Sequence, residues 1–199
     1  MVEMDNRLIS KLLRGLKVTT GYITALMLFL IFIMPILTFA RDNFEGAVTV
    51  FSFFIFIILF YIVYTDMHAV AFKEKRPQYN INPAPYRGAL YGFIGIIPLV
   101  IIQSVLMIIE FPEDLLTLKK RLYQAFGGPL YWMSRLLGDA PFHYLVSFTA
   151  LIIIAGLGYY AGHKDFYLLR TIREKLGIKP KKKTDRTGGQ KGHKNDRAT

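Results

Sequence analysis

Residues 46–65 read GAVTVFSFFIFIILFYIVYT and contain no Asp, Glu, Lys or Arg. Residues 18–40, 88–109 and 140–163 share this property. Each stretch has about the ~20 residues that a helix needs to cross the hydrocarbon layer of a bilayer. Water cannot satisfy backbone groups in that layer, so a spanning segment must be helical. The sequence therefore predicts an all-α integral membrane protein.

The predicted transmembrane domain covers residues 18–163. The turn after the first span, residues 41–45, is short, so the first two spans should form an antiparallel hairpin. The last two spans should form a second hairpin. The predicted spans are about 18–40, 46–68, 88–110 and 140–163.

The predicted outer loop, residues 111–139, is amphipathic. Its second half contains Tyr131 and Trp132, the only tryptophan of the chain. Aromatic side chains of this kind are enriched at the membrane interface, so we expect this part of the loop to lie on the outer membrane surface. The alternative is a re-entrant segment that dips into the bilayer.

The regions flanking the spans are basic. Residues 1–17 and 164–178 combine apolar and basic residues at helical spacing, which predicts two amphipathic helices that lie in the headgroup plane. Residues 179–199 contain almost no apolar side chain. Such a segment cannot bury enough surface to offset the entropy of ordering, so we expect a disordered polybasic tail.

The positive charges are unevenly placed. The net charge is +11, and only five of the 25 Lys and Arg residues fall in the two loops that face away from the termini. Lys and Arg are retained on the cytoplasmic side of membrane proteins. We therefore expect a cell-membrane protein with both termini in the cytoplasm. The chain has no cysteine, which fits a bacterial source and excludes disulfides and thiolate chemistry.

Glycines are concentrated at the predicted inner ends of spans three and four. Pairs of small residues four positions apart allow helix backbones to approach closely. We expect these glycines to pack spans three and four together near the cytoplasm, with a groove for a lipid tail or a partner helix as the alternative. The predicted helix-packing residues are Gly88, Gly92, Gly95, Gly158 and Gly162.

Gln103 and Ser104 form the most polar adjacent pair within a span. Polar groups in a membrane mark transport pathways when they face a hydrated cavity. More often they form hydrogen bonds with a neighbouring helix, and we favour this interpretation.

The predicted inner ends of spans two and four contain a candidate metal or hydrolytic site. Imidazole and carboxylate groups are common ligands of divalent metals. Residues two apart on a helix point in different directions, however, so the more ordinary interpretation is a set of solvated interfacial groups. The four residues are Asp66, His68, His163 and Asp165.

The polybasic tail is the predicted site for anionic lipid headgroups. Each Lys or Arg near a membrane surface contributes on the order of 1 kcal/mol to this attraction. The same charges could contact nucleic acid or the ribosome, but the tail has no aromatic side chain that would stack on bases. The predicted headgroup-binding residues are Lys179, Lys181, Lys182, Lys183 and Arg186.

The sequence has no nucleotide-binding loop, nucleophile elbow or zinc-protease motif. We therefore expect a non-enzymatic accessory or scaffolding subunit without a cofactor, which binds membrane lipids and either another membrane protein or its own copies. One alternative is a component of a small-solute transporter. A second is a membrane-interface enzyme that uses the Asp66, His68, His163 and Asp165 set on a lipid.

Overall fold

A computed structural model describes four segments of the chain, residues 8–39, 43–76, 83–112 and 115–166. All regular elements in these segments are helical. They are α1 (Leu8–Phe39), α2 (Phe44–Glu74), α3 (Arg87–Ile108), α4 (Leu116–Phe126), the 3-10 helix η4 (Gly128–Leu130), α5 (Tyr131–Leu137), α6 (Pro141–Ser147) and α7 (Thr149–His163).

Within the described segments, four helices are long and apolar enough to cross a membrane. They cover Leu8–Ile36, Glu45–Glu74, Arg87–Ile108 and Pro141–His163, the last of which comprises α6 and α7. The prediction of an all-helical fold with four such helices is confirmed for the described residues. Residues 8–17, predicted as a separate interfacial helix, are the first turns of α1. Likewise, α2 continues past the predicted span to Glu74.

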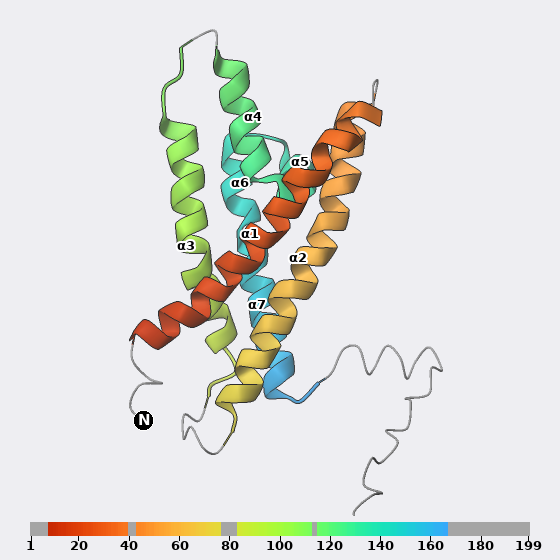
Figure 1. Cartoon of the computed structure of the whole chain (residues 1–199). Coiled ribbons are helices and arrows are strands. Elements are labelled where there is room, and N and C mark those ends of the chain that lie inside the picture. Colours follow the sequence, from red (N-terminus) through yellow and green to blue (C-terminus); the bar gives the residue numbers. More distant parts are fainter. Residues whose placement is uncertain (1–7, 40–42, 77–82, 113–114, 167–199) are drawn as a thin grey trace, which may run out of the picture. The chain divides into compact units, whose positions relative to one another are not determined.

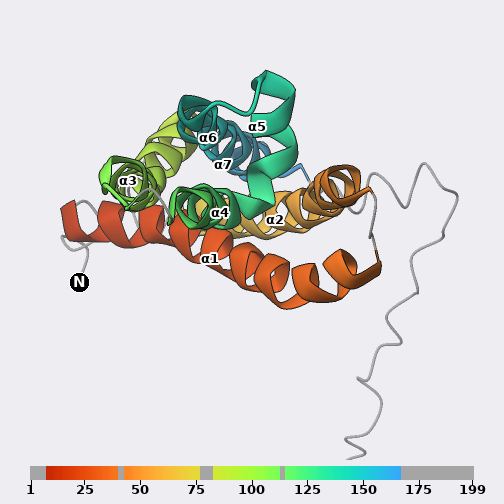
Figure 2. The same ribbon diagram turned by 90° about the horizontal axis from the view of Figure 1, so that it is seen from above.

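The four long helices contact one another in a ring. α2 and α3 each pack against both α1 and α7, and α1 and α7 lie on opposite sides of the bundle (Figure 2). Figure 1 shows that α1 and α3 run in one direction, whereas α2 and α7 run in the other. The start of α1, the end of α2, the start of α3 and the end of α7 therefore meet at one end of the bundle, which we call the inner end.

Each long helix buries one stripe of side chains at the three- and four-residue spacing of a helical face. On α2 this stripe is apolar except for Ser52 and for Glu74, which ends it. Its buried members are Val48, Ser52, Ile55, Leu59, Val63, Met67, Val70 and Glu74.

The segment between α3 and α6 enters the bundle. α4 runs back beside α3 from the far end, which we call the outer end (Figure 1). Residues 127–131 are all buried, and they contact α1 and α2. This arrangement differs from the expectation that Tyr131 lies on an outer membrane surface. Sequence reasoning favoured a surface position because aromatic residues suit an interface, but here Tyr131 packs beside Tyr144 of α6.

Candidate functional site

The most distinctive polar group is the carboxylate of Glu74 at the inner end. Glu74 is the last residue of α2 and is only 3% exposed. It is buried because it continues the stripe of Met67 and Val70, which points toward the other helices. A buried carboxylate is costly unless it is paired and hydrogen-bonded.

The partners of Glu74 come from the three other long helices. From α1, Arg14 Nη1 lies 2.8 Å from Glu74 Oε1. From α3, Tyr91 donates a 2.8 Å hydrogen bond to Oε1, and Arg87 Nη1 lies 3.8 Å from Oε2. From α7, Tyr159 donates a 2.5 Å hydrogen bond to Oε2. One carboxylate therefore links all four long helices, and we call these five residues the Glu74 cluster.

The Glu74 cluster has an excess of positive charge. Two guanidinium groups, those of Arg14 and Arg87, face one carboxylate. Because Arg14 also lies 3.4 Å from the Tyr91 hydroxyl, its guanidinium is held by two helices. Fixed cations at the inner end can bind an anion without first being ordered.

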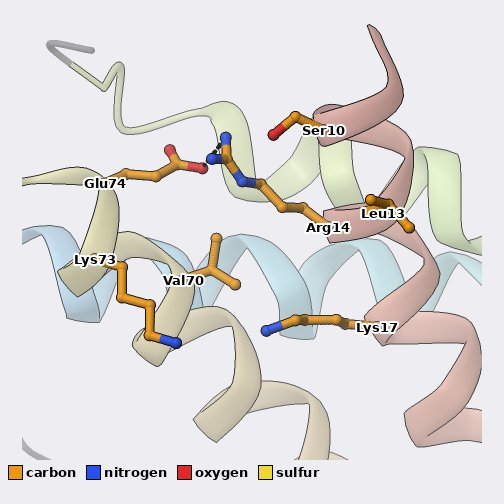
Figure 3. Close-up of a pocket in the computed structure, with 7 residues that line it drawn as sticks. All are labelled: Ser10, Leu13, Arg14, Lys17, Val70, Lys73 and Glu74. Carbon is orange, nitrogen blue, oxygen red and sulfur yellow. Dashed lines mark ion pairs between the residues drawn. The ribbon is translucent and has the colours of Figure 1, made fainter. Parts of the chain in front are cut away.

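A pocket of about 280 Å³ lies between α1 and α2 next to the Glu74 cluster. Figure 3 shows Arg14 and Glu74 paired at one side of this pocket, with Lys17 and Lys73 reaching from the two helices. This inner pocket is lined by Ser10, Leu13, Arg14, Lys17, Val70, Lys73 and Glu74. It thus combines three basic side chains with apolar walls.

A second polar cluster joins residues 115–140, which we call the inserted loop, to the long helices of the bundle. The buried Ser52 hydroxyl donates a 2.7 Å hydrogen bond to the Gly128 carbonyl and accepts one of 3.1 Å from the Trp132 amide. Tyr22 donates a 2.5 Å hydrogen bond to the Phe126 carbonyl. Side chains of α1 and α2 therefore form hydrogen bonds with the loop backbone.

The two residues of the predicted polar pair, Gln103 and Ser104, lie in different environments. Gln103 is fully buried, and its amide donates a 3.3 Å hydrogen bond to the Tyr123 carbonyl of α4. Its Oε1 has no hydrogen-bond partner among the described residues. Ser104 is half-buried. Gln103 thus forms its hydrogen bond with a neighbouring helix, α4, which is part of the inserted loop.

The predicted packing glycines approach three different helices. A Cβ added at Gly88 or Gly92 would lie within 3.0 Å of atoms of α7, and one at Gly95 would overlap α1. Gly158 and Gly162 instead lie against the backbone of α2 at Tyr64 and His68. We expected both sets to join spans three and four. Of these five glycines only Gly88 and Gly92 join α3 to α7, because Gly95 faces α1 and the two α7 glycines face α2.

The four candidate metal ligands have other contacts. Asp165 forms an ion pair with Lys75, and His68 Nε2 donates a 3.1 Å hydrogen bond to the Phe166 carbonyl. His163 Nδ1 is buried and has no partner among the described residues, and Asp66 is half-buried. Where the chain is described, no three His, Asp or Glu residues gather closely enough to hold a metal ion.

The predicted headgroup-binding residues Lys179, Lys181, Lys182, Lys183 and Arg186 lie outside the described residues, as does most of the predicted helix 164–178. Two important residues inside the described region were not singled out from the sequence. Glu74 and Ser52 both follow the three- and four-residue spacing of the apolar stripe on α2, and tracing that spacing along the whole helix would have identified them.

Comparison of the chain with protein-family models, curated proteins and solved structures finds no match. Its function must therefore be inferred from its own residues. The Glu74 cluster and the inner pocket provide the most specific geometry for this purpose, because they combine buried charge, fixed partners and an accessible cavity.

Proposed function

We propose that the chain is an integral protein of the cell membrane, with its four long helices crossing the bilayer as two antiparallel hairpins. The first hairpin is α1 with α2, and the second is α3 with the α6–α7 helix. Many large apolar side chains on these helices are exposed, including Phe54 of α2 and Phe93 of α3. Such exposure is unfavourable in water but suits a lipid environment.

We further propose that the inner end faces the cytoplasm and that the inserted loop is re-entrant from the opposite side. Most Lys and Arg residues belong to the segments at the inner end or to the tail that follows them, which supports this orientation. Ser52 lies about 12 Å along the helix axis from Phe44, the first residue of α2, given a rise of about 1.5 Å per residue. The backbone partners of Ser52 would then lie below the outer membrane surface.

Within that membrane we propose a non-enzymatic role as an accessory or scaffolding subunit. The observation that carries this proposal is the attachment of all four long helices to one buried carboxylate, Glu74. A bundle held together in this way presents a fixed outer surface to a second membrane protein. The basic tail would add attraction to anionic lipids on the same side.

Site-specific photocrosslinking tests this role. A photoreactive side chain at exposed Phe54 or Phe93 is expected to capture one membrane protein, or a second copy of the chain, in a constant ratio. The matched control is the same group at Leu59, which is buried in α2 and should capture no separate chain. Crosslinks to lipid alone from every exposed position, together with purification as a lone chain, would contradict an accessory role.

A further inference from the structure

The inner pocket carries positive charge that is not neutralised within the described region. Lys17 of α1 and Lys73 of α2 line it, and neither forms an ion pair with a described residue. Among the described residues that line the pocket, Glu74 is the only acidic one, and both of its oxygens already have partners. The pocket therefore favours an anion.

The cations of the pocket come from two helices, α1 and α2. Arg14 is fixed by Glu74 and is only 16% exposed at its side chain. Lys17 follows Arg14 by about one helical turn, so the two side chains share a face of α1. Lys73 approaches from α2, and Ser10 adds a hydroxyl donor from α1. Such a set of donors can surround a phosphate group, which has several acceptor oxygens.

The remaining walls of the pocket are apolar. Leu13 and Val70 line it together with the cations. Lys17 immediately precedes the uncharged stretch that begins at Val18, and Lys73 lies in the last turn of α2. In the proposed orientation these lysines lie at the level of the cytoplasmic headgroups. A ligand at this depth would have an anionic head beside the lysines and an apolar part beside Leu13.

We propose that the inner pocket binds the phosphate group of an anionic phospholipid from the cytoplasmic leaflet. This proposal rests on the proposed membrane location of the chain. The pocket volume of about 280 Å³ lies just below the ~300–1,000 Å³ range of small-molecule sites, which suits a headgroup better than a whole lipid. The acyl chains would then extend along the exposed apolar surface of α1.

Lipid binding to charge variants of the full-length chain tests the site. The purified protein in detergent is titrated with phosphatidylglycerol or phosphatidylcholine, and native mass spectrometry measures the bound lipid. We expect preferential binding of phosphatidylglycerol. Lys17→Gln and Lys73→Gln should each weaken it about five-fold, and the double variant about 30-fold, given the usual contribution of one lysine near an anionic headgroup.

Lys164→Gln provides the matched control. Lys164 is an exposed cation that directly follows α7 at the same end of the bundle, but it does not line the pocket. This variant should bind phosphatidylglycerol as the parent protein does. The polybasic tail is present in all variants, so its contribution is the same in each. Equal weakening in Lys164→Gln, or no weakening in the double variant, would overturn the proposal.

Inorganic phosphate distinguishes a lipid site from a site for a soluble anion. We expect millimolar phosphate to leave phosphatidylglycerol bound, because it lacks the apolar part of the ligand. If phosphate displaces phosphatidylglycerol completely and binds alone with the same affinity as the lipid, the assignment to lipid is overturned.

Membrane insertion of the same variants is measured in parallel. A chain that fails to insert contradicts the proposed function, whereas an inserted chain without lipid preference contradicts only the pocket proposal.

Discussion

The hydroxyl of Tyr159 donates a 2.5 Å hydrogen bond to Oε2 of Glu74, although 85 residues separate the two in the sequence. Both residues are buried at the inner end, where α2 and α7 lie side by side. Hydrogen bonds to a charged partner contribute about 1.5–3 kcal/mol, roughly twice the value for neutral pairs. This contact therefore couples the last turn of α2 to α7.

Tyr159→Phe should lower the free energy of unfolding by about 1.5–3 kcal/mol, because Glu74 loses one of its hydrogen-bond donors. Chemical unfolding in detergent micelles measures this change. Tyr160→Phe is the matched control, since Tyr160 is the next residue in α7 but is 51% exposed. Similar unfolding curves for the two variants would show that the hydroxyl of Tyr159 contributes no stability.

Glu74→Gln should cause a larger loss, about 3–5 kcal/mol, because Arg14 and Arg87 then lack a counter-charge while they remain partly buried. The control is Glu45→Gln at the outer end, where Glu45 is 71% exposed and pairs with Arg135, a contact worth about 0–1 kcal/mol. Adding Arg14→Gln to Glu74→Gln should recover part of the lost stability. Strict additivity of the two substitutions would contradict a direct charge pair.

Much of the fold could be predicted from the sequence because lipid-compatible helices need a long uncharged run, which is a local property. The burial of Glu74 was not predicted, because a sequence pattern describes only residues that are close together in the chain. Glu74 follows Lys73 and precedes Lys75, so its immediate neighbours indicate a solvated helix end. Its burial depends on Arg14, Tyr91 and Tyr159, which are distant in sequence and become neighbours only when the four helices assemble.

The insertion of the loop could not be predicted for a related reason. Its amphipathic pattern fits a membrane surface and a protein interior equally well. Insertion is favoured by hydrogen bonds to the loop backbone within the bundle, which involve the side chains of Ser52, Gln103 and Tyr22. Each of these residues, considered alone, is an ordinary polar residue within an apolar helix. Similarly, glycine spacing indicated close helix approach but could not identify which helix each glycine contacts.

Gly158→Ala should destabilise the contact between α7 and α2. An added Cβ at this position would lie 2.6 Å from the carbonyl oxygen of Tyr64 and 2.9 Å from its Cα. Because backbone atoms cannot move aside cheaply, we expect a loss of about 1–3 kcal/mol in unfolding measurements. Gly156→Ala is the control, since its nearest neighbouring atoms are 3.8 Å away. That variant should be neutral, or gain up to about 1 kcal/mol from helix propensity.

Ser52→Ala should loosen the inserted loop. The Gly128 carbonyl and the Trp132 amide would both lose their hydrogen-bond partner inside the bundle, at a cost of about 1–3 kcal/mol. Hydrogen exchange of the Trp132 amide is the direct measurement, and it should become faster. Thr20→Ala removes an exposed hydroxyl that bonds only within its own helix, so it should leave this exchange unchanged. Unaltered exchange in Ser52→Ala would contradict the anchoring of the loop by this residue.

The absence of cysteine allows the proposed topology and the position of the loop to be tested with single-cysteine variants. Leu136→Cys, at a position that is 76% exposed in α5, should react with a membrane-impermeant maleimide added to intact cells. Lys164→Cys, at the inner end, should react only after the cells are permeabilised. Leu130→Cys should stay unreactive in both conditions, because Leu130 is fully buried between the helices. Labelling of Lys164→Cys in intact cells would reverse the proposed orientation. Rapid labelling of Leu130→Cys would instead show that the loop lies on the surface, since helical packing protects that position only when the loop is inserted.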